Sequence, residues 1–379
     1  MKIAIISLIP CENYGGIMQS YALQTVLSRM GHDVTIISKS RKIKTIGWKK
    51  IIIYPIRIIR KYVFHKKITI RNNEKKIKWY NRNEDNRCRE IYSFLRKYLH
   101  IDYINQFKDI RKGRFDVIIV GSDQVWRPCY FEQQYKEPIS NAFLSFAKDW
   151  QLKRYSYAAS FGVENWEYTE NDTLMCAELL SLFDGISVRE ESGVSQCSRY
   201  FGIDAVKLID PTLLLCQEDY LTLLPQNNVV SKGNLLVYLL DETQSALSLV
   251  DKIVREENLV PFNTNVAWTD CKGNAITKPS VQTWLSGYRD ADFVITDSYH
   301  ACIFSILFNK PFVVVGNKQR GISRLSSLLS DFGLEHHLLC SVEEYCAGSY
   351  SLDKIEVESR LVSLRKKAME FLELISYEK

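Results

Sequence analysis

The chain alternates between short apolar runs and longer segments in which apolar residues recur every three to four positions. In the first half, apolar runs predict strands at 3–8, 32–38, 115–120, 154–159, 185–188 and 205–209. Helical periodicity predicts helices over 17–29 and 172–182, and Gly31 stands where the first of them should end. A strand, a helix and a second strand in this order form a βαβ unit, so the pattern indicates a parallel sheet covered by helices.

The same alternation restarts after a polar segment, 226–234, that Pro211 and Pro225 precede. We therefore expect two Rossmann-like α/β domains, with a ligand site in the cleft between the carboxyl ends of both sets of strands. The predicted N-terminal domain is 1–212, the linker region is 213–233, and the C-terminal domain is 234–379. In the C-terminal domain the pattern predicts strands at 234–240, 259–265, 292–296 and 311–315, helices at 243–257, 280–287, 300–308 and from about 321, and a final amphipathic helix over 354–375.

Composition agrees with a globular protein of two domains, because 379 residues exceed one ordinary core. No apolar run reaches 18 residues, so no membrane-spanning helix is expected, and the first residues are typical of a strand rather than a signal peptide. The ten cysteines are scattered with no CxxC pair, which excludes the common zinc spacings. We expect free thiols in a reducing cytoplasm and neither a metal nor a cofactor.

Charge is concentrated in residues 39–78, which we call the basic segment. It holds fifteen Lys and Arg against the single acid Glu74, so it carries +14 while the rest of the chain carries −8. On a helical wheel over 49–63, cations gather on one side and isoleucines on the other, although Pro55 starts or kinks such a helix. Two interpretations stay open: a peripheral contact with the inner face of the plasma membrane, and a cover over the edge of the first sheet. Interleaved isoleucine argues against nucleic acid as the partner.

Two loops of the predicted N-terminal domain offer groups for a ligand. Asn13, Gly15 and Gly16 precede the first helix, where paired glycines allow close backbone approach and the helix start attracts an anion. The alternative is a tight turn, because the common nucleotide fingerprints are absent. After the strand 115–120 come polar side chains that suit sugar hydroxyls, or else form a turn that leads away from the sheet: Ser122, Asp123 and Gln124.

Two further residues follow strands and carry chemistry. Arg189 ends the strand 185–188, and its forked guanidinium suits a carboxylate or phosphate; the alternative is an ion pair with Glu190 or Glu191. His300 stands at the start of a helix directly after a strand, with Asp297 and Ser298 beside it. That position suits a general base or a donor to a developing anion, and the alternative is a structural histidine.

Four passages, in this order, resemble the polysaccharide pyruvyl transferase family: NYGGIMQSYALQTVLSRMGHDV, DVIIVGSDQVWRP, SVREESG followed by LIDPTLLL, and ADFVITDSYHACIFSILFNKPFVVV. The resemblance covers 1–38 and 114–335 but not the basic segment. It implies a glycosyltransferase-B-like architecture and transfer of the enolpyruvyl unit of phosphoenolpyruvate to a sugar diol of a surface or exopolysaccharide intermediate, as a cyclic ketal.

The resemblance also implies roles for single residues. Arg189 matches an arginine associated with the anionic groups of the donor, Asp123 an acidic position of the first domain, and His300 the histidine of the second-domain motif. Ser298 departs from the family pattern, in which many members have arginine and so provide a partner for phosphate. Arg320, or Lys318 beside it, is the expected replacement.

Three functions are compatible with the sequence. The first is a pyruvyl transferase that acts on a glycan, polymeric or lipid-linked. The second is a nucleotide-sugar-dependent glycosyltransferase of the same architecture, and the third is a non-catalytic glycan-assembly module. Dependence on phosphoenolpyruvate or on a nucleotide sugar separates the first two.

Overall fold

A computed structural model describes residues 1–10, 13–39, 85–225, 231–264, 277–316 and 322–376 of the chain. The basic segment lies outside the described residues except for Lys39, so both interpretations of it stay open. Arg320 and Lys318 also lie outside them. Among the described helices, none combines the length and the apolar character that crossing a bilayer requires.

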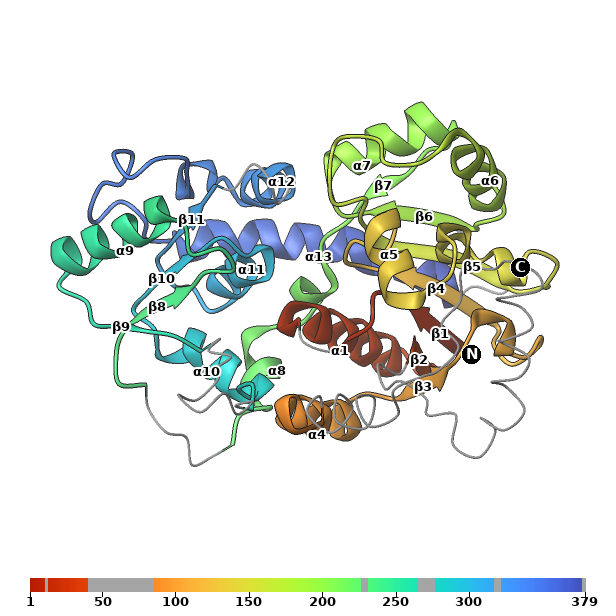
Figure 1. The fold of residues 1–379 in the computed structure, drawn as a ribbon, viewed down its shortest axis with the longest axis horizontal. Coiled ribbons are helices and arrows are strands. Elements are labelled where there is room, and N and C mark those ends of the chain that lie inside the picture. The colour runs from red at the N-terminus through yellow and green to blue at the C-terminus, as the bar shows by residue number, and fades with distance from the viewer. Residues whose placement is uncertain (11–12, 40–84, 226–230, 265–276, 317–321, 377–379) are drawn as a thin grey trace, which may run out of the picture.

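The first of two parallel sheets has seven strands in the order β3-β2-β1-β4-β5-β6-β7 (Figure 1). Its central strands are buried apolar runs, as expected for parallel strands that helices cover on both faces. The elements of this part are β1 (Lys2–Ile6), α1 (Tyr14–Arg29), β2 (Asp33–Lys39), α4 (Arg89–Tyr98), β3 (Ile101–Ile104), β4 (Val117–Gly121), α5 (Pro128–Tyr135), β5 (Lys153–Ala159), α6 (Glu170–Leu180), β6 (Gly185–Val188), α7 (Glu191–Gln196) and β7 (Val206–Lys207).

The second sheet has five parallel strands in the order β12-β11-β10-β8-β9. Thr243 and Ser280 begin two of its helices, because each side chain accepts a hydrogen bond from a backbone N–H of the first turn. A short helix, α8 (Gln217–Leu221), precedes this sheet. The elements that follow are β8 (Leu235–Tyr238), α9 (Gln244–Glu257), β9 (Pro261–Phe262), α10 (Val281–Asp290), β10 (Phe293–Thr296), α11 (Tyr299–Leu307), β11 (Phe312–Val315), α12 (Ile322–Phe332), β12 (Leu338–Leu339) and α13 (Lys354–Ser376).

The two sheets confirm the predicted pair of Rossmann-like α/β domains. The structure corrects several details: β3, α5 and β12 have no counterpart in the prediction, and α1 begins at Tyr14 instead of residue 17. The sequence predicts the last helix, α13, within the C-terminal domain. In the structure this helix runs back across the N-terminal domain (Figure 1). Arg365 of α13 donates to the carbonyls of Leu213 and Leu215, and Phe371 packs edge-on against Tyr155 of β5.

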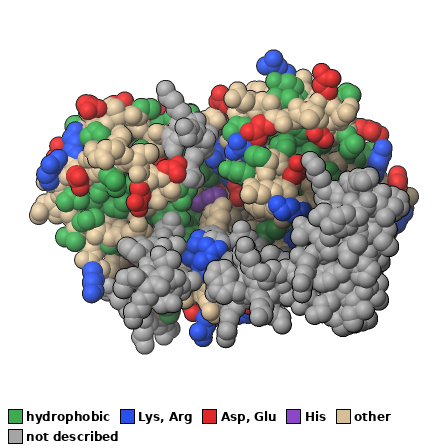
Figure 2. All heavy atoms as spheres, viewed as in Figure 1, with side chains coloured by type: hydrophobic (Ala, Val, Ile, Leu, Met, Phe, Trp, Pro, Cys, Tyr) green, Lys and Arg blue, Asp and Glu red, His purple; other side chains and the backbone are tan. Residues whose placement is uncertain are grey.

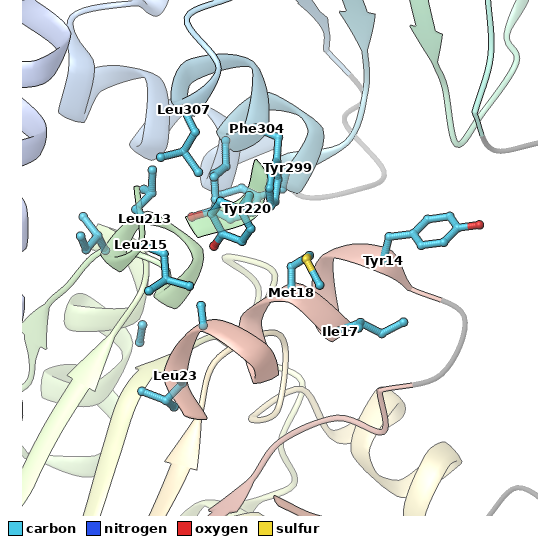
Figure 3. Packing of buried hydrophobic residues seen from close by; sticks show 14 of the residues in the cluster. Tyr14, Ile17, Met18, Leu23, Leu213, Leu215, Tyr220, Tyr299, Phe304 and Leu307 are labelled. Carbon is cyan, nitrogen blue, oxygen red and sulfur yellow. The ribbon is translucent and has the colours of Figure 1, made fainter. Parts of the chain in front are cut away.

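An apolar interface joins the domains beside the cleft. Figure 3 shows four buried side chains that converge at this interface: Met18 of α1, Leu213 before α8, Tyr220 of α8 and Phe304 of α11. Tyr14 stacks on Trp284 with ring centroids 5.5 Å apart, and its hydroxyl donates to the Pro279 carbonyl. Burial of these large side chains stabilises this packing of the two domains, at about 25 cal/mol per Å² of apolar surface.

Candidate active site

A cavity of about 390 Å³ lies between the domains, where the carboxyl ends of both sheets meet. The first domain lines it with Asn13, Asp123, Gln124, Arg127 and Tyr130, and the second contributes Tyr238, Lys278, Ser298, His300 and Arg324. Figure 2 shows a hollow between the two halves with a histidine side chain in it. A larger cavity of about 510 Å³ lies between α4, α8 and α10, and none of the predicted site residues lines it. The cavity at the strand ends is therefore the candidate active site.

His300 lies where two helix N-termini meet, one from each domain. It is the second residue of α11, and Gly15 is the second residue of α1. A Cβ atom at Gly15 would lie 2.1 Å from the Cγ and Nδ1 atoms of the His300 ring. Gly15 thus supports the histidine rather than a ligand, which explains why a glycine is required there. Two helix starts, each with about half a positive charge, favour an anion in the cavity.

Asp210 is the centre of a buried polar network behind His300, and sequence reasoning did not select it. One oxygen, Oδ2, accepts hydrogen bonds from Arg189 at 3.0 Å and from Gln19, and lies 3.7 Å from His300 Nε2. Its other oxygen accepts from the backbone N–H and the hydroxyl of Thr212. Burial alone raises the pKa of Asp210, but its interactions with His300 and Arg189 hold that pKa well below the usual range.

Arg189 does not line the cavity in this conformation. Its side chain is 1% exposed and lies near three carboxylates, with Asp210 at 3.0 Å, Glu190 at 3.7 Å and Asp123 at 3.9 Å. Its guanidinium lies 4.4 Å from the centroid of the Tyr299 ring. The ion pair with Glu190, the alternative considered for this position, is present. Contact between Arg189 and a donor stays a prediction.

The loop after β4 has an unusual backbone at two non-glycine residues. Ser122 and Asp123 have φ angles of 23° and 57°, in the left-handed region. Such residues cost roughly 1–3 kcal/mol each and cluster at functional sites. The loop is held because Ser122 N–H donates to the Tyr157 carbonyl and Ser160 N–H donates to the Asp123 carbonyl. This arrangement places the Asp123 carboxylate at the cavity, whereas Ser122 is bound to Gln19 and lies behind it.

The remaining predicted residues gather around the same cavity. Asn13 lines it and donates to Asp123 at 3.4 Å. Gln124 lines it and accepts from Arg127 at 3.2 Å. Ser298 begins α11 as its N-cap residue, without a capping hydrogen bond from its side chain, and lines the cavity as well. Gly16, in the first turn of α1, lies near Asn13 and Asp123.

Three cations of the cavity were missed by sequence reasoning: Arg127, Lys278 and Arg324. Arg127 forms a two-point ion pair with Glu167, which fixes its orientation. Burial, followed by the charge of Arg189, lowers the pKa of Arg324. Arg127 lies three residues after Gln124 in the chain, which is a usable signal. Lys278 and Arg324 carry no such signal in the sequence.

Fold and site together define a protein of two parallel-sheet α/β domains with a candidate active site between them. The family model of polysaccharide pyruvyl transferase matches residues 13–319. The chain therefore belongs to the polysaccharide pyruvyl transferase family, and the protein is a transferase. Within the described ranges no group of three His, Cys, Asp or Glu side chains is arranged to hold a metal.

Solved structures of several glycosyltransferases are similar to the chain. A glycosyltransferase from Rickettsia africae is 12% identical over 100% of both chains, with a TM-score of 0.49. Arabidopsis thaliana UGT89C1 complexed with UDP-L-rhamnose is 10% identical over 98% of both chains, with a TM-score of 0.48. Thermobaculum terrenum O-GlcNAc transferase is 11% identical, with a TM-score of 0.41; the match covers 100% of this chain and 64% of that protein's length. None of the curated proteins matches the chain.

Proposed function

We propose that the protein transfers the pyruvyl unit of phosphoenolpyruvate to two hydroxyls of one sugar in a surface or exopolysaccharide intermediate, forming a cyclic ketal. The observation that carries this proposal is the convergence of His300 with Arg127, Lys278 and Arg324 on one cavity. Cations for an anionic donor and a histidine for proton transfer are the two requirements of the reaction.

The donor carries a carboxylate and a phosphate that repel each other, so its site needs several positive groups. Arg324 and Arg189 both lie over the ring of Tyr299, at 5.9 and 4.4 Å from its centroid. The positive charge of Arg189 repels that of Arg324 and lowers its pKa. A bound anion would offset this repulsion. The N-termini of α1 and α11 add to the attraction, because neither helix has an acid in its first turn.

Transfer proceeds in two additions to C2 of the donor. An acceptor hydroxyl bonds to C2 while C3 takes up a proton and becomes a methyl group. The bond between C2 and the phosphate oxygen then breaks, and a second hydroxyl of the same sugar bonds to C2. Of the two hydroxyl protons released, one is matched by the proton that C3 takes up, and the other leaves with inorganic phosphate. His300 accepts a hydroxyl proton, and Asp123, at the same cavity, orients the sugar.

Incubation of the purified protein with a glycan acceptor and either phosphoenolpyruvate or a nucleotide sugar tests this function. We expect acceptor-dependent release of inorganic phosphate from phosphoenolpyruvate and no consumption of the nucleotide sugar. The reverse result would assign the protein to the nucleotide-sugar-dependent glycosyltransferases.

The proposed place of work is the cytoplasmic face of the plasma membrane, beside a lipid-linked acceptor. The charge of +14 in the basic segment and its isoleucines support this proposal, since each cation near an anionic surface contributes about 1 kcal/mol. Sedimentation with anionic vesicles tests it, with Lys49, Lys50, Arg57, Arg60 and Lys61 changed to Gln in a second protein. Equal pelleting of both proteins, or of neither, would leave the segment as a cover over the first sheet.

A further inference from the structure

We propose that Asp210 is a positioning residue that holds the His300 ring with Nε2–H directed at its carboxylate, so that Nδ1 accepts the proton of the acceptor hydroxyl. This inference rests on the proposed function for the step that it serves. Asp210 does not line the cavity, so it acts on the reaction through His300.

The geometry around both side chains supports one orientation. Asp210 Oδ2 lies 3.7 Å from His300 Nε2, and both side chains are buried. Among the described residues Nε2 has no hydrogen-bond partner, and catalytic contacts are often longer than a hydrogen bond in structures without substrate. Gly15 packs next to the Cγ–Nδ1 bond of the ring, and His300 itself lines the cavity. A ring held between a carboxylate and a glycine has little freedom to rotate.

Asp210 is itself fixed, which a positioning residue requires. Five hydrogen-bond donors, from four residues, surround its carboxylate: the Arg189 guanidinium, the Gln19 amide, the Ser122 hydroxyl at 3.5 Å, and the backbone N–H and hydroxyl of Thr212. Asp210 also begins a turn of helix with Pro211 after it. Its charged form is therefore retained at neutral pH.

Other charged groups around His300 do not replace Asp210. Arg189 lies on Tyr299, the neighbour of His300, and is balanced by Asp123, Glu190 and Asp210. Asp297, Arg127, Lys278 and Arg324 line the same cavity as His300. Asp297 accepts hydrogen bonds from the backbone N–H groups of Leu240 and Asp241. Asp210 is thus the carboxylate that the structure places at His300 Nε2.

The pair also spans the two domains. Asp210 follows β7 of the first sheet, and His300 begins α11 of the second. Nearby contacts, such as the ion pair of Lys207 with Asp331 at 2.6 Å, hold the same boundary together. The base and the carboxylate that positions it therefore come from different domains, so their contact depends on how the two domains pack together.

The tautomer of His300 in the unaltered protein gives the first test and requires no activity. Long-range ¹H–¹⁵N spectra of the six histidines, with His300 assigned by His300→Gln, show which ring nitrogen carries the proton. We expect the neutral ring to be protonated at Nε2. A neutral ring protonated at Nδ1 would overturn the proposal even if the protein is an active pyruvyl transferase.

Three variants give the second test, in which kcat/KM is measured against pH. Asp210→Asn removes the negative charge that lies next to the ring. We expect the acid limb of the profile to move down by about one pH unit and kcat to fall at least ~10-fold. Asp210→Glu keeps the charge, so the limb should stay in place while kcat falls. Thr212→Val removes a hydrogen bond to the other carboxylate oxygen and should lower the melting temperature without moving the limb.

The outcomes separate a positioning role from a structural one. The proposal would be overturned if the acid limb of the pH profile stays in place in a folded Asp210→Asn protein. It would also be overturned if Thr212→Val moves that limb by the same amount as Asp210→Asn. If Asp210→Asn does not fold, the tautomer decides. If no pyruvyl transfer is found at all, the proposed function fails, whereas the titration of the His300 ring in the spectra still reports whether Asp210 faces it.

Discussion

The imidazole of His300 rests on the Cα atom of Gly15, and these two residues begin helices of different domains. A Cβ atom at residue 15 would lie 2.1 Å from the ring, which is far inside van der Waals contact. The ring is buried and its Nε2 lies 3.7 Å from Asp210 Oδ2, so a methyl group at residue 15 would push it out of this position. The position of the candidate catalytic base therefore depends on the absence of one methyl group.

A methyl group in place of a hydrogen atom on Gly15 Cα should displace the His300 ring from its position at the cavity. We expect Gly15→Ala to lower kcat by about 10²-fold, the scale of a lost acid–base group. Gly16→Ala is the matched control, because a Cβ atom there would lie 3.5 Å from Asn13 and 3.6 Å from Asp123, in ordinary contact. Similar losses in both variants would contradict the account of Gly15.

Removal of the imidazole itself should abolish proton transfer while leaving the fold intact. We expect His300→Ala to lower kcat by at least ~10²-fold with an unchanged circular dichroism spectrum. Gly15→Ala acts through the His300 ring that packs against it. The double variant Gly15→Ala with His300→Ala should therefore lose little more activity than His300→Ala alone. Turnover near that of the unaltered protein would return His300 to a structural role.

Arg189→Lys keeps the charge of residue 189 but loses the fork that reaches Asp210. We expect weaker binding of phosphoenolpyruvate by calorimetry and a lower melting temperature, because buried carboxylates lose a partner. Arg324→Lys, at a residue that lines the cavity, is the comparison. Unchanged affinity in Arg189→Lys together with a loss in Arg324→Lys would assign the donor contact to Arg324.

His337 makes stability depend on pH. Its side chain is fully buried, and Nδ1–H donates to the Phe312 carbonyl at 2.7 Å. Burial lowers its pKa to about 4, below the ordinary value of 6.5. The unfolded chain therefore takes up a proton first as pH falls, and stability is lost from about pH 6.5 down to 4.

Urea unfolding at pH 7 and pH 5 measures this effect. The free energy of unfolding of the unaltered protein should fall by about 2 kcal/mol more between these values than that of His337→Gln. His336→Gln, at the exposed neighbour, is the control and should behave like the unaltered protein. Equal slopes in the unaltered protein and His337→Gln would contradict the assignment.

The fold could be predicted because each central strand is an apolar run followed by a helical period, as in β1 with α1 and β10 with α11. His300 and Asp123 could be found because each directly follows such a strand. Asp210 could not be selected, because its partners Gln19, Arg189 and His300 lie far away in the sequence. The contact of Arg189 with Tyr299 could not be predicted either, because Tyr299 belongs to the other domain.

Mass spectrometry of the glycan product tests the central claim most directly. Candidate acceptors are incubated with phosphoenolpyruvate and either the unaltered protein or His300→Ala. We predict a product that carries one pyruvate ketal on a single sugar ring, with one phosphate released for each ketal, and almost none of it with His300→Ala. A pyruvylated product formed equally by both proteins would contradict the assigned role of His300. A glycan that gains a sugar from a nucleotide donor, and never a ketal, would contradict the account as a whole.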